Sequence, residues 1–420
     1  MNKKIACIIL AAGKSTRMKS GTPKVLHPVC GRPMLEYVLD LTEQLCIKRT
    51  VAVLGFKHAE VRKYLRAGIK PVIQKRLLGT ADAVKTGLSA LKGFQGTVVI
   101  LYGDTPLLKK ETVKKLLDYH IQGNADATLL TATPEKCAGY GRILRDKYSS
   151  IAGIVEEKDA DDFQKEIREV NTGISCFNKK SLDAVLKNVR PNNRKKEYYL
   201  TDCISLLYKN KGLIDGIKLS DIDEAMGINS RVELAKANRL MQSRINEEFM
   251  KHGVSIVDPA TSHIAFGTRI GQDTVIYPFT VIERNVKIGK CCSVGPFARL
   301  REGTELCDNV SAGSFLETVR SKLGPKTLAK HFGYLGDSRI GSNVNVGAGT
   351  VVANFDGKKK NLTAIGDRAF IGSDTVIVAP VKIGRGARTG AGSVVTRDVP
   401  AGETVAGVPA KAFKKRRGKR

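Results

Sequence analysis

Aliphatic residues recur at every sixth position through much of the C-terminal third of the chain. The first run has eight members, namely Ile264, Ile270, Ile276, Ile282, Ile288, Val294, Leu300 and Leu306. The period returns as Ile340, Val346 and Val352, and again as Ile365, Ile371, Ile377 and Ile383. Neither a helix nor an alternating strand has this period. It predicts a parallel β-helix of hexapeptide repeats, in which each short face turns one aliphatic side chain inward.

Two stretches, 322–332 and 354–363, break the six-residue period. Interruptions of a solenoid form loops, and loops on one face commonly carry the functional site. We therefore expect a loop at each stretch.

The first half of the chain has a different pattern, in which short apolar runs alternate with helical periodicity. The predicted strands are Ile5–Leu10, Thr50–Gly55, Val72–Gln74, Thr97–Leu101 and Ala127–Ala132. The predicted helices between them are Met34–Leu45, Ala59–Leu65, Ala81–Ala90 and Lys109–His120. This alternation predicts a doubly wound, Rossmann-like α/β sheet, whose ligands bind at the carboxyl ends of the strands.

A long helix is predicted between these two regions. Ser230 and Glu233 have the spacing of a capping box. One apolar stripe follows, made of Leu234, Ala237, Met241, Ile245 and Phe249. We expect an α/β domain at residues 1–226, a linker helix at 227–250, a β-helix at 251–410 and a basic tail at 411–420.

Composition limits the cellular setting and the partners. The formal net charge is +29, and no apolar run is long enough to span a membrane. This charge favours anionic ligands, but the sequence has no nucleic-acid-binding motif, so specific nucleic-acid binding is not expected. The N-terminal MNKKIACIILAA could be a signal peptide, but its basic continuation favours a buried strand. The nine cysteines are then most simply reduced thiols of a cytoplasmic protein.

The loop that follows the first predicted strand carries the most specific motif. It reads LAAGKSTRM and is followed by Pro23 and Lys24. Small residues allow backbone amides to approach phosphate oxygens. Arg17 and Lys24 can neutralise the charge of a triphosphate and of a leaving pyrophosphate.

These motifs resemble those of the nucleotidyltransferases that couple sugar 1-phosphates to nucleoside triphosphates. Together with the hexapeptide repeats, the chain resembles the family of bifunctional N-acetylglucosamine-1-phosphate uridylyltransferase/glucosamine-1-phosphate N-acetyltransferases over nearly its whole length. The resemblance implies a nucleotidyltransferase domain followed by a left-handed parallel β-helix, assembled as a homotrimer. It also implies UTP, N-acetylglucosamine 1-phosphate, glucosamine 1-phosphate and acetyl-CoA as substrates, and Mg²⁺ as the cofactor.

The resemblance implies a binding site for UTP and the sugar nucleotide in the first domain. Its members would be Leu10, Ala11, Ala12, Gly13, Lys24, Gln74, Gly79, Thr80, Tyr102, Gly103, Asp104, Gly141, Glu156, Asn171 and Asn229. Asp104 and Asn229 would bind Mg²⁺, which takes few carboxylates together with phosphate oxygens. The amide of Gln74 offers a donor and an acceptor to a pyrimidine edge. Arg17 and Lys24 would act by charge neutralisation, because the attacking phosphate is already an anion.

A second site is implied in the β-helix. His331, in the segment KHFGYLGD, would be the general base, because acyl transfer from a thioester needs the attacking amine deprotonated. The sugar phosphate would contact Arg301, Arg320, Tyr334, Asn345 and Lys360. Acetyl-CoA would contact Ala348, Asn354, Phe355, Ser373 and Ala391.

Three positions depart from the family pattern at this second site. Val319 stands where the family usually has a phosphate-binding Lys, although Arg320 could reach around the corner of the coil. Phe355 replaces a Tyr, and Gly407 replaces an Arg that contacts CoA. The alternative is therefore a uridylyltransferase alone, whose β-helix is a trimerising scaffold. A non-catalytic subunit is disfavoured, because Arg17, Lys24 and both metal ligands are present.

Overall fold

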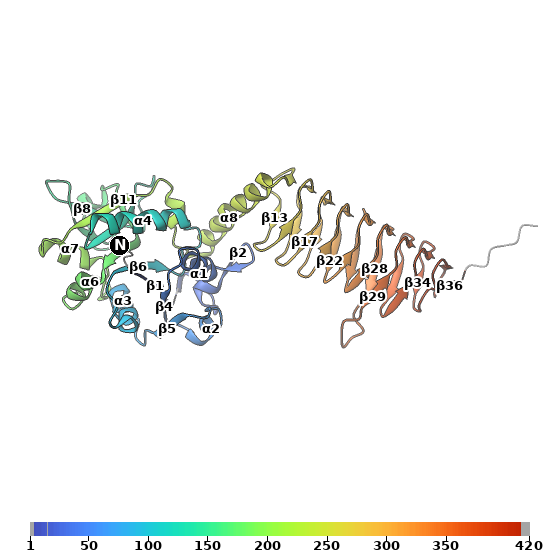
Figure 1. Ribbon diagram of the computed structural model, residues 1–420, viewed down its shortest axis with the longest axis horizontal. Coiled ribbons are helices and arrows are strands. Elements are labelled where there is room, and N and C mark those ends of the chain that lie inside the picture. Colours follow the sequence, from blue (N-terminus) through green and yellow to red (C-terminus); the bar gives the residue numbers. More distant parts are fainter. Residues whose placement is uncertain (1–3, 15, 413–420) are drawn as a thin grey trace, which may run out of the picture. The chain divides into compact units, whose positions relative to one another are not determined.

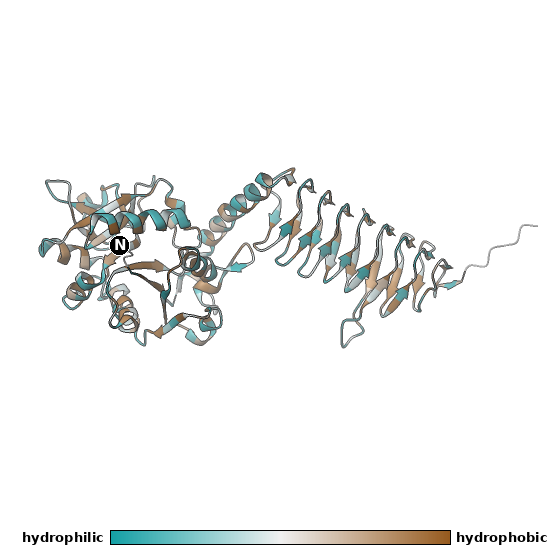
Figure 2. Ribbon diagram, viewed as in Figure 1, coloured by the Kyte–Doolittle hydropathy of each residue, from teal (hydrophilic) through white to brown (hydrophobic). Residues whose placement is uncertain are grey.

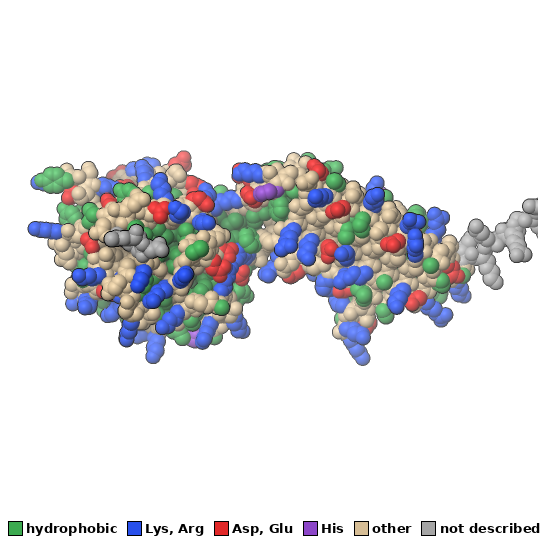
Figure 3. Space-filling view, in the orientation of Figure 1, with side chains coloured by type: hydrophobic (Ala, Val, Ile, Leu, Met, Phe, Trp, Pro, Cys, Tyr) green, Lys and Arg blue, Asp and Glu red, His purple; other side chains and the backbone are tan. Residues whose placement is uncertain are grey.

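A computed structural model describes residues 4–14 and 16–412 of the chain. It divides into two compact units, Met1–Asn238 and Arg239–Arg420 (Figure 1). Most of the predicted basic tail, from residue 413 onward, lies outside the described residues. None of the described helices is long and apolar enough to cross a membrane. Lys and Arg side chains are distributed over the visible surface of both units (Figure 3).

The first unit contains a nine-stranded mixed sheet. Its main path is β11 (Ile214–Lys218), β7 (Ala127–Ala132), β10 (Val170–Asn178), β6 (Thr97–Tyr102), β1 (Ile5–Ala11), β4 (Arg49–Leu54) and β5 (Ile69–Ile73). Two further strands, β8 (Gly141–Arg145) and β9 (Ile151–Val155), branch from β10. All five predicted strands are present, and β10 alone of the main path runs antiparallel to its neighbours. A small separate hairpin pairs β2 (Pro28–Val29) with β3 (Arg32–Pro33).

Helices cover both faces of this sheet. On one face α3 (Thr80–Leu88), α6 (Lys179–Leu186) and α7 (Asp202–Lys209) share a hydrophobic core with Ile8 of β1. On the other face α1 (Met34–Gln44), α2 (His58–Arg62) and α4 (Lys110–Gly123) share a second core with Ile9. The short α5 (Asp162–Lys165) has no buried residue. Alternate residues of β1 thus belong to two separate cores, and the predicted doubly wound class is confirmed. The central strands of this sheet are hydrophobic (Figure 2).

The long helix α8 (Arg231–Lys251) begins at the predicted capping box. The backbone amide of Glu233 donates to Ser230 Oγ at 3.2 Å, and the amide of Ser230 donates to Glu233 Oε2 at 2.8 Å. Together these bonds satisfy donors that the first turn of a helix leaves open.

The second unit consists of three sheets of parallel strands, typical of a hexapeptide β-helix, and its last strand, Lys411–Ala412, pairs antiparallel with its neighbour. The first sheet contains β12 (Ser255–Ile256), β15 (Val275–Ile276), β18 (Ser293–Val294), β21 (Ser311–Ala312), β24 (Leu328–Ala329), β27 (Asn345–Val346), β30 (Phe370–Ile371), β33 (Arg388–Thr389), β35 (Thr404–Ala406) and β36 (Lys411–Ala412). The second contains β13 (His263–Ile264), β16 (Val281–Ile282), β19 (Arg299–Leu300), β22 (Leu316–Val319), β25 (Gly333–Gly336), β28 (Thr350–Ala353), β31 (Val376–Val378) and β34 (Val394–Val395). The third contains β14 (Arg269–Ile270), β17 (Lys287–Ile288), β20 (Glu305–Leu306), β23 (Lys322–Leu323), β26 (Ser338–Ile340), β29 (Thr363–Ile365) and β32 (Val381–Ile383). The aliphatic residues of the six-residue period form the core between them.

The prediction of a loop at 322–332 is wrong. That stretch contains β23 and β24, and its pairing to the neighbouring coils continues. Lys322 pairs with Glu305, 17 positions earlier, whereas Glu305 pairs with Lys287, 18 positions earlier. The period breaks because the corner between the second and third sheets has one residue fewer.

The second predicted loop is confirmed. Ser338 of β26 pairs with Thr363 of β29, 25 positions later, and the extra residues follow β28. They project from the coil in Figure 1. The shortened corner and this insertion lie at the same corner of successive coils.

Candidate active sites

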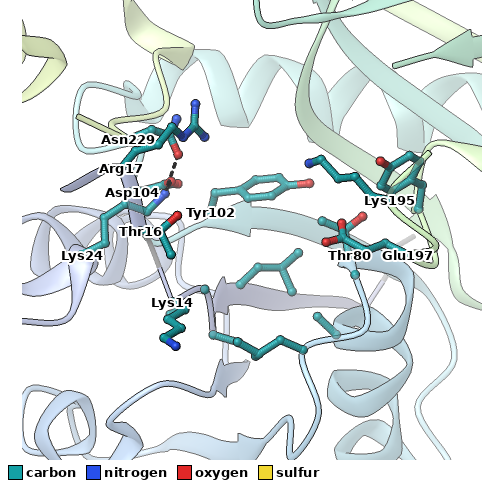
Figure 4. Close-up of a pocket in the computed structure, with 18 of the residues that line it drawn as sticks. Lys14, Thr16, Arg17, Lys24, Thr80, Tyr102, Asp104, Lys195, Glu197 and Asn229 are labelled. Carbon is teal, nitrogen blue, oxygen red and sulfur yellow. Dashed lines mark hydrogen bonds and ion pairs between the residues drawn. The ribbon is translucent and has the colours of Figure 1, made fainter. Parts of the chain in front are cut away.

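A cavity of about 940 Å³ opens at the carboxyl edge of the sheet in the first unit (Figure 4). The predicted residues that line it are Leu10, Ala11, Ala12, Gly13, Arg17, Lys24, Gln74, Gly79, Thr80, Tyr102, Asp104, Glu156 and Asn229. Gly103, Gly141 and Asn171 are not among its lining residues. The neighbouring parallel strands β1 and β6 end here, which is where ligands of doubly wound sheets bind.

Lys24, Asp104 and Asn229 meet at one point of this cavity (Figure 4). The Lys24 ammonium donates to the carboxylate of Asp104, and it lies 2.9 Å from Asn229 Oδ1. The structure therefore brings together both predicted metal ligands and one predicted catalytic cation.

Backbone contacts hold this cluster in place. The amide of Ile228 donates to the carbonyl of Asp104 at 3.0 Å, which ties the two ligand segments together. Asn229 Nδ2 donates to the carbonyl of Gly227 at 3.1 Å, so its side-chain oxygen faces Lys24. Gly103 precedes Asp104, and a Cβ there would lie 3.1 Å from the Val25 side chain, so the backbone at this position is closely packed.

The donor set of this cluster suits Mg²⁺. One carboxylate and one amide oxygen already converge on a cation, the ammonium of Lys24, and Mg²⁺ prefers oxygen ligands. Within the described residues there is no group of three or more His, Cys, Asp or Glu side chains able to hold a metal. A metal here would therefore take its remaining ligands from phosphates and water.

The loop after β1 forms the cationic end of the cavity. Ala12 is buried and its carbonyl accepts from the amide of Phe56 at 3.1 Å, which anchors the loop. Lys14, Thr16 and Arg17 line the cavity beyond it (Figure 4). Lys14 and Thr16 were not predicted as site residues, although both lie inside the phosphate-binding motif.

Gln74, Gly79 and Thr80 line the cavity beside the N-terminus of α3. Gln74 is only 5% exposed, and its Nε2 donates to the carbonyl of Gly79 and to Asp82. Gly79 has φ +115°, and a Cβ there would lie 2.4 Å from the carbonyl oxygen of Tyr198. This position therefore requires glycine.

Tyr102 and Glu156 line a further part of the cavity. Burial raises the pKa of Tyr102, and burial also raises the pKa of Glu156. The hydroxyl of Thr201 donates to Glu156 Oε1 at 3.1 Å. Asn171 turns its Oδ1 to the backbone amide of Gly173 at 3.1 Å, so it supports the wall next to Tyr102.

The segment before α7 contributes lining residues that the sequence did not reveal. Lys195, Glu197 and Tyr199 line the cavity, as do Gly139, Glu157 and Lys158. The segment 190–201 has no hydrophobic periodicity, and the only available signal was its mixture of aromatic and charged residues between two helices.

In the second unit, the altered corner holds a polar cluster. The Arg320 guanidinium donates to both carboxylate oxygens of Asp337, at 2.6 and 2.8 Å. Asn354 Nδ2 donates to the same carboxylate. The Arg320 contact is the main cause that lowers the pKa of Asp337. Val319 next to it is buried, and the cation that pairs with Asp337 is Arg320.

Tyr334 and Lys360 border this cluster. A Cβ at Gly336 would lie 2.7 Å from the Tyr334 hydroxyl and 2.5 Å from Asn354 Nδ2, so both side chains cover this glycine. The ammonium of Lys360 lies 4.5 Å from the ring centroid of Phe355. Phe355 thus contacts a predicted site residue through its ring, without the hydroxyl of the family Tyr.

His331 lies at the opposite corner of the second sheet, and the four-residue strand β25 separates it from Asp337. His331 is exposed. By strand register it occupies the same corner position as Ala348 in the next coil. Ser373 and Ala391 continue this column, since the amide of Asp374 donates to Ala348 and that of Gly392 donates to Ser373.

Two further predicted residues lie near this sheet. Arg301 pairs with Glu317 at 2.8 Å on its outer face. Asn345 lies in β27 of the first sheet, three residues before Ala348. The predicted acetyltransferase residues therefore occupy the second sheet, its two corners and the adjoining strand of the first sheet.

The chain is similar to known proteins in both units. Residues 7–168 match the MobA-like NTP transferase domain family, and residues 267–311 and 363–397 match the bacterial transferase hexapeptide family. A solved structure of a putative glucose-1-phosphate thymidylyltransferase from Bacillus anthracis is 21% identical, with a TM-score of 0.45 over 56% of this chain and 94% of that one. This last similarity adds nothing to the assignment.

Relatives match nearly the whole chain. The bifunctional protein GlmU of Thermosipho africanus is 44% identical over 94% of this chain and 92% of its own length. That of Geobacillus sp. (strain WCH70) is 42% identical over 94% and 93%. That of Listeria monocytogenes serotype 4a is 40% identical over 95% and 94%. The chain therefore belongs to the bifunctional GlmU family, the uridylyltransferase/acetyltransferases that make UDP-N-acetylglucosamine.

Proposed function

We propose that residues 1–226 carry out the uridylyl transfer, that residues 251–410 carry out the acetylation, and that the helix at 227–250 links them. The observation that carries the first assignment is the convergence of Lys24, Asp104 and Asn229 in the cavity of the first unit.

In the uridylyl transfer, an oxygen of N-acetylglucosamine 1-phosphate attacks the α-phosphorus of UTP. The bond from that phosphorus to the β-phosphate oxygen breaks, and pyrophosphate leaves. No protein base is needed, because the nucleophile is already an anion. Arg17 and Lys24 neutralise phosphate charge as it shifts to the leaving group. Mg²⁺, held by Asp104 and Asn229, would supply further charge neutralisation.

In the acetylation, the amine of glucosamine 1-phosphate attacks the thioester carbonyl of acetyl-CoA. His331 accepts the amine proton, the carbon–sulfur bond breaks, and CoA leaves as a thiol. The exposed position of His331, one short strand away from the Arg320–Asp337 pair, supports this role. Arg320 keeps further N–H groups free for the sugar phosphate after it pairs with Asp337.

The two activities can be tested in one preparation. Free thiol is measured with acetyl-CoA and glucosamine 1-phosphate, and pyrophosphate with UTP and N-acetylglucosamine 1-phosphate. His331→Ala should abolish only thiol release, and Asp104→Ala only pyrophosphate release. Pyrophosphate release without any thiol release in the unmodified protein would favour the uridylyltransferase-only alternative. Loss of both activities in either folded variant would contradict the assignment of two sites.

We also propose a homotrimer. Phe279, Phe297 and Phe315 stack along one corner of the β-helix, with centroids 5.0 and 4.9 Å apart. They are 53, 46 and 64% exposed. An apolar column of this length favours burial against another subunit. We place the enzyme in the cytoplasm, since all nine cysteines are free.

A further inference from the structure

The side-chain amide of Gln74 has one chemically possible orientation. Its Nε2 lies 3.1 Å from the carbonyl oxygen of Gly79 and 2.8 Å from Asp82 Oδ2. Both of these partners are acceptors, so the NH₂ group of the amide must face them. The reversed amide would place its own oxygen against two oxygens.

The orientation decides what Gln74 offers to a ligand. Its two N–H groups are used, which leaves Oε1 as its free polar atom. Among the described residues Oε1 has no hydrogen-bond donor, and it is not one of the buried atoms without a partner. Because Gln74 lines the cavity, Oε1 can serve the ligand there. Gln74 therefore presents an acceptor, which needs a donor on the base.

We propose that Asp82 is a positioning residue that sets the base preference of this site. By holding the amide of Gln74 with its oxygen toward the cavity, Asp82 favours a pyrimidine whose ring nitrogen carries a hydrogen. Uracil has this N–H at N3, whereas N3 of cytosine is an acceptor and would face the oxygen unpaired. The inference rests on the proposed uridylyl transfer at the same site.

Asp82 is better suited to this task than the other acceptor, Gly79. The Gly79 carbonyl also accepts the amide of Ala83 at 3.2 Å, so it is shared. Asp82 is a carboxylate, and hydrogen bonds to charged groups are the stronger ones. It lies in the first turn of α3, where Leu200 donates to Thr80 Oγ1 at 2.9 Å and Ala81 donates to Tyr198. These contacts fix the first turn of α3, and with it the position of the Asp82 carboxylate.

Removal of this acceptor should change specificity and not only rate. Without Asp82, one N–H of Gln74 loses its partner, and the amide can turn its NH₂ group toward the cavity. That orientation would suit N3 of cytosine. A residue with a merely structural role would lower activity with UTP and CTP alike.

The test compares kcat/KM for pyrophosphate release with UTP and with CTP. Asp82→Ala should lower the UTP-to-CTP ratio by about tenfold or more, because an unpaired polar group in a binding site is strongly discriminating. Asp82→Asn keeps an acceptor oxygen and should retain most of the ratio. Asp118→Asn removes an exposed carboxylate of α4 that pairs with Lys114, and it should behave as the unmodified chain. Thermal unfolding of each variant, compared with that of the unmodified chain, reports on folding of the first unit.

An unchanged ratio in Asp82→Ala would overturn the inference. Equal losses in Asp82→Ala and Asp82→Asn would overturn it as well, because they would assign the effect to charge. Failure of the proposed function is a distinct result, since the unmodified protein would then release no pyrophosphate with either nucleotide.

Discussion

The ammonium of Lys24 lies 2.9 Å from the side-chain oxygen of Asn229, which is 205 positions later in the chain. The same ammonium contacts the carboxylate of Asp104. The cation that would face phosphate charge is therefore paired with the two ligands proposed for Mg²⁺. A bound Mg²⁺ would compete with Lys24 for the same oxygens, so metal binding would release Lys24 toward the phosphates.

Removal of Lys24 should separate these two effects. Lys24→Ala should lower kcat for pyrophosphate release on the order of 10²–10³-fold, as loss of one transition-state charge contact does. The Mg²⁺ concentration for half-maximal rate should fall, because the metal no longer competes for Asp104. Measuring the rate of pyrophosphate release at increasing Mg²⁺ concentrations gives both kcat and the half-maximal Mg²⁺ concentration. An unchanged kcat would exclude a role for Lys24 in catalysis, and thiol release serves as the control.

Arg320 should compensate for Val319 in binding the sugar phosphate. Arg320→Ala should raise the KM for glucosamine 1-phosphate about tenfold with little change in kcat. The KM of Arg320→Lys should lie between those of Arg320→Ala and the unmodified chain, because an ammonium cannot bind Asp337 and phosphate in the same forked geometry. Arg299→Ala, which removes an outward Arg paired with Glu283, is the matched control. Equal KM values in all variants would exclude Arg320 from the site.

Phe355 should support acetylation through its contact with Lys360. Phe355→Leu keeps an apolar side chain but removes the aromatic face, which is worth about 0.5–1 kcal/mol at an exposed site. We expect kcat/KM for acetylation to fall about two- to fivefold, while Phe355→Tyr keeps the wild-type value. Steady-state thiol release measures this. A loss in Phe355→Tyr equal to that in Phe355→Leu would contradict the ring contact.

Asp202 should make the stability of the first unit depend on pH. Burial, and then the charges of Glu156 and Asp159, raise the pKa of Asp202 from 3.8 to about 6. A raised acid pKa means that the folded unit loses stability as the pH rises from about 4 to about 6. Asp202→Asn should therefore raise stability by about 1 kcal/mol above pH 6, or about 2–4 °C in Tm. Calorimetry should show this gain shrink as the pH falls to 4; a gain independent of pH would contradict it.

The stacked phenylalanines should report on assembly. Phe297→Glu places a charge in the middle of the column, between Phe279 and Phe315. Sedimentation should then show a shift from trimer toward monomer, with uridylyl transfer retained. His263→Glu introduces the same charge on the outer face of the second sheet and should leave the assembly unchanged. A trimeric Phe297→Glu variant would exclude this column from the subunit interface.

The six-residue period was sufficient to predict most of the β-helix. Its inward positions are visible in sequence because each face can bury only one large side chain. The corner near Arg320 was not predictable from that period. Arg320 has φ +48° and Asp337 has φ +50°, and each forms a corner with one residue fewer. A missing residue looks in sequence like the end of the repeat, although Leu323 and Leu335 return to the same core.

In the first unit, motifs identified residues on the loops after β1 and β6 but not those that support them. Asp82 and Gln74 are eight positions apart, and only the fold places the carboxylate of Asp82 within 2.8 Å of the Gln74 amide. Lys195 and Tyr199 line the cavity from a segment without periodicity. Contacts between distant segments of this kind require the tertiary structure.

The corner that loses one residue in two coils and gains a loop in the next is a place where chain length can change at low cost. Each coil pairs only with its two neighbours, so an insertion or deletion there leaves the inward residues of the other coils in position. Mutation can therefore reshape this edge of the β-helix by adding or removing residues, as well as by exchanging them. The same corner is suited to protein engineering. Loops of other lengths can be inserted between β28 and β29, because complete coils of the β-helix lie before and after this position.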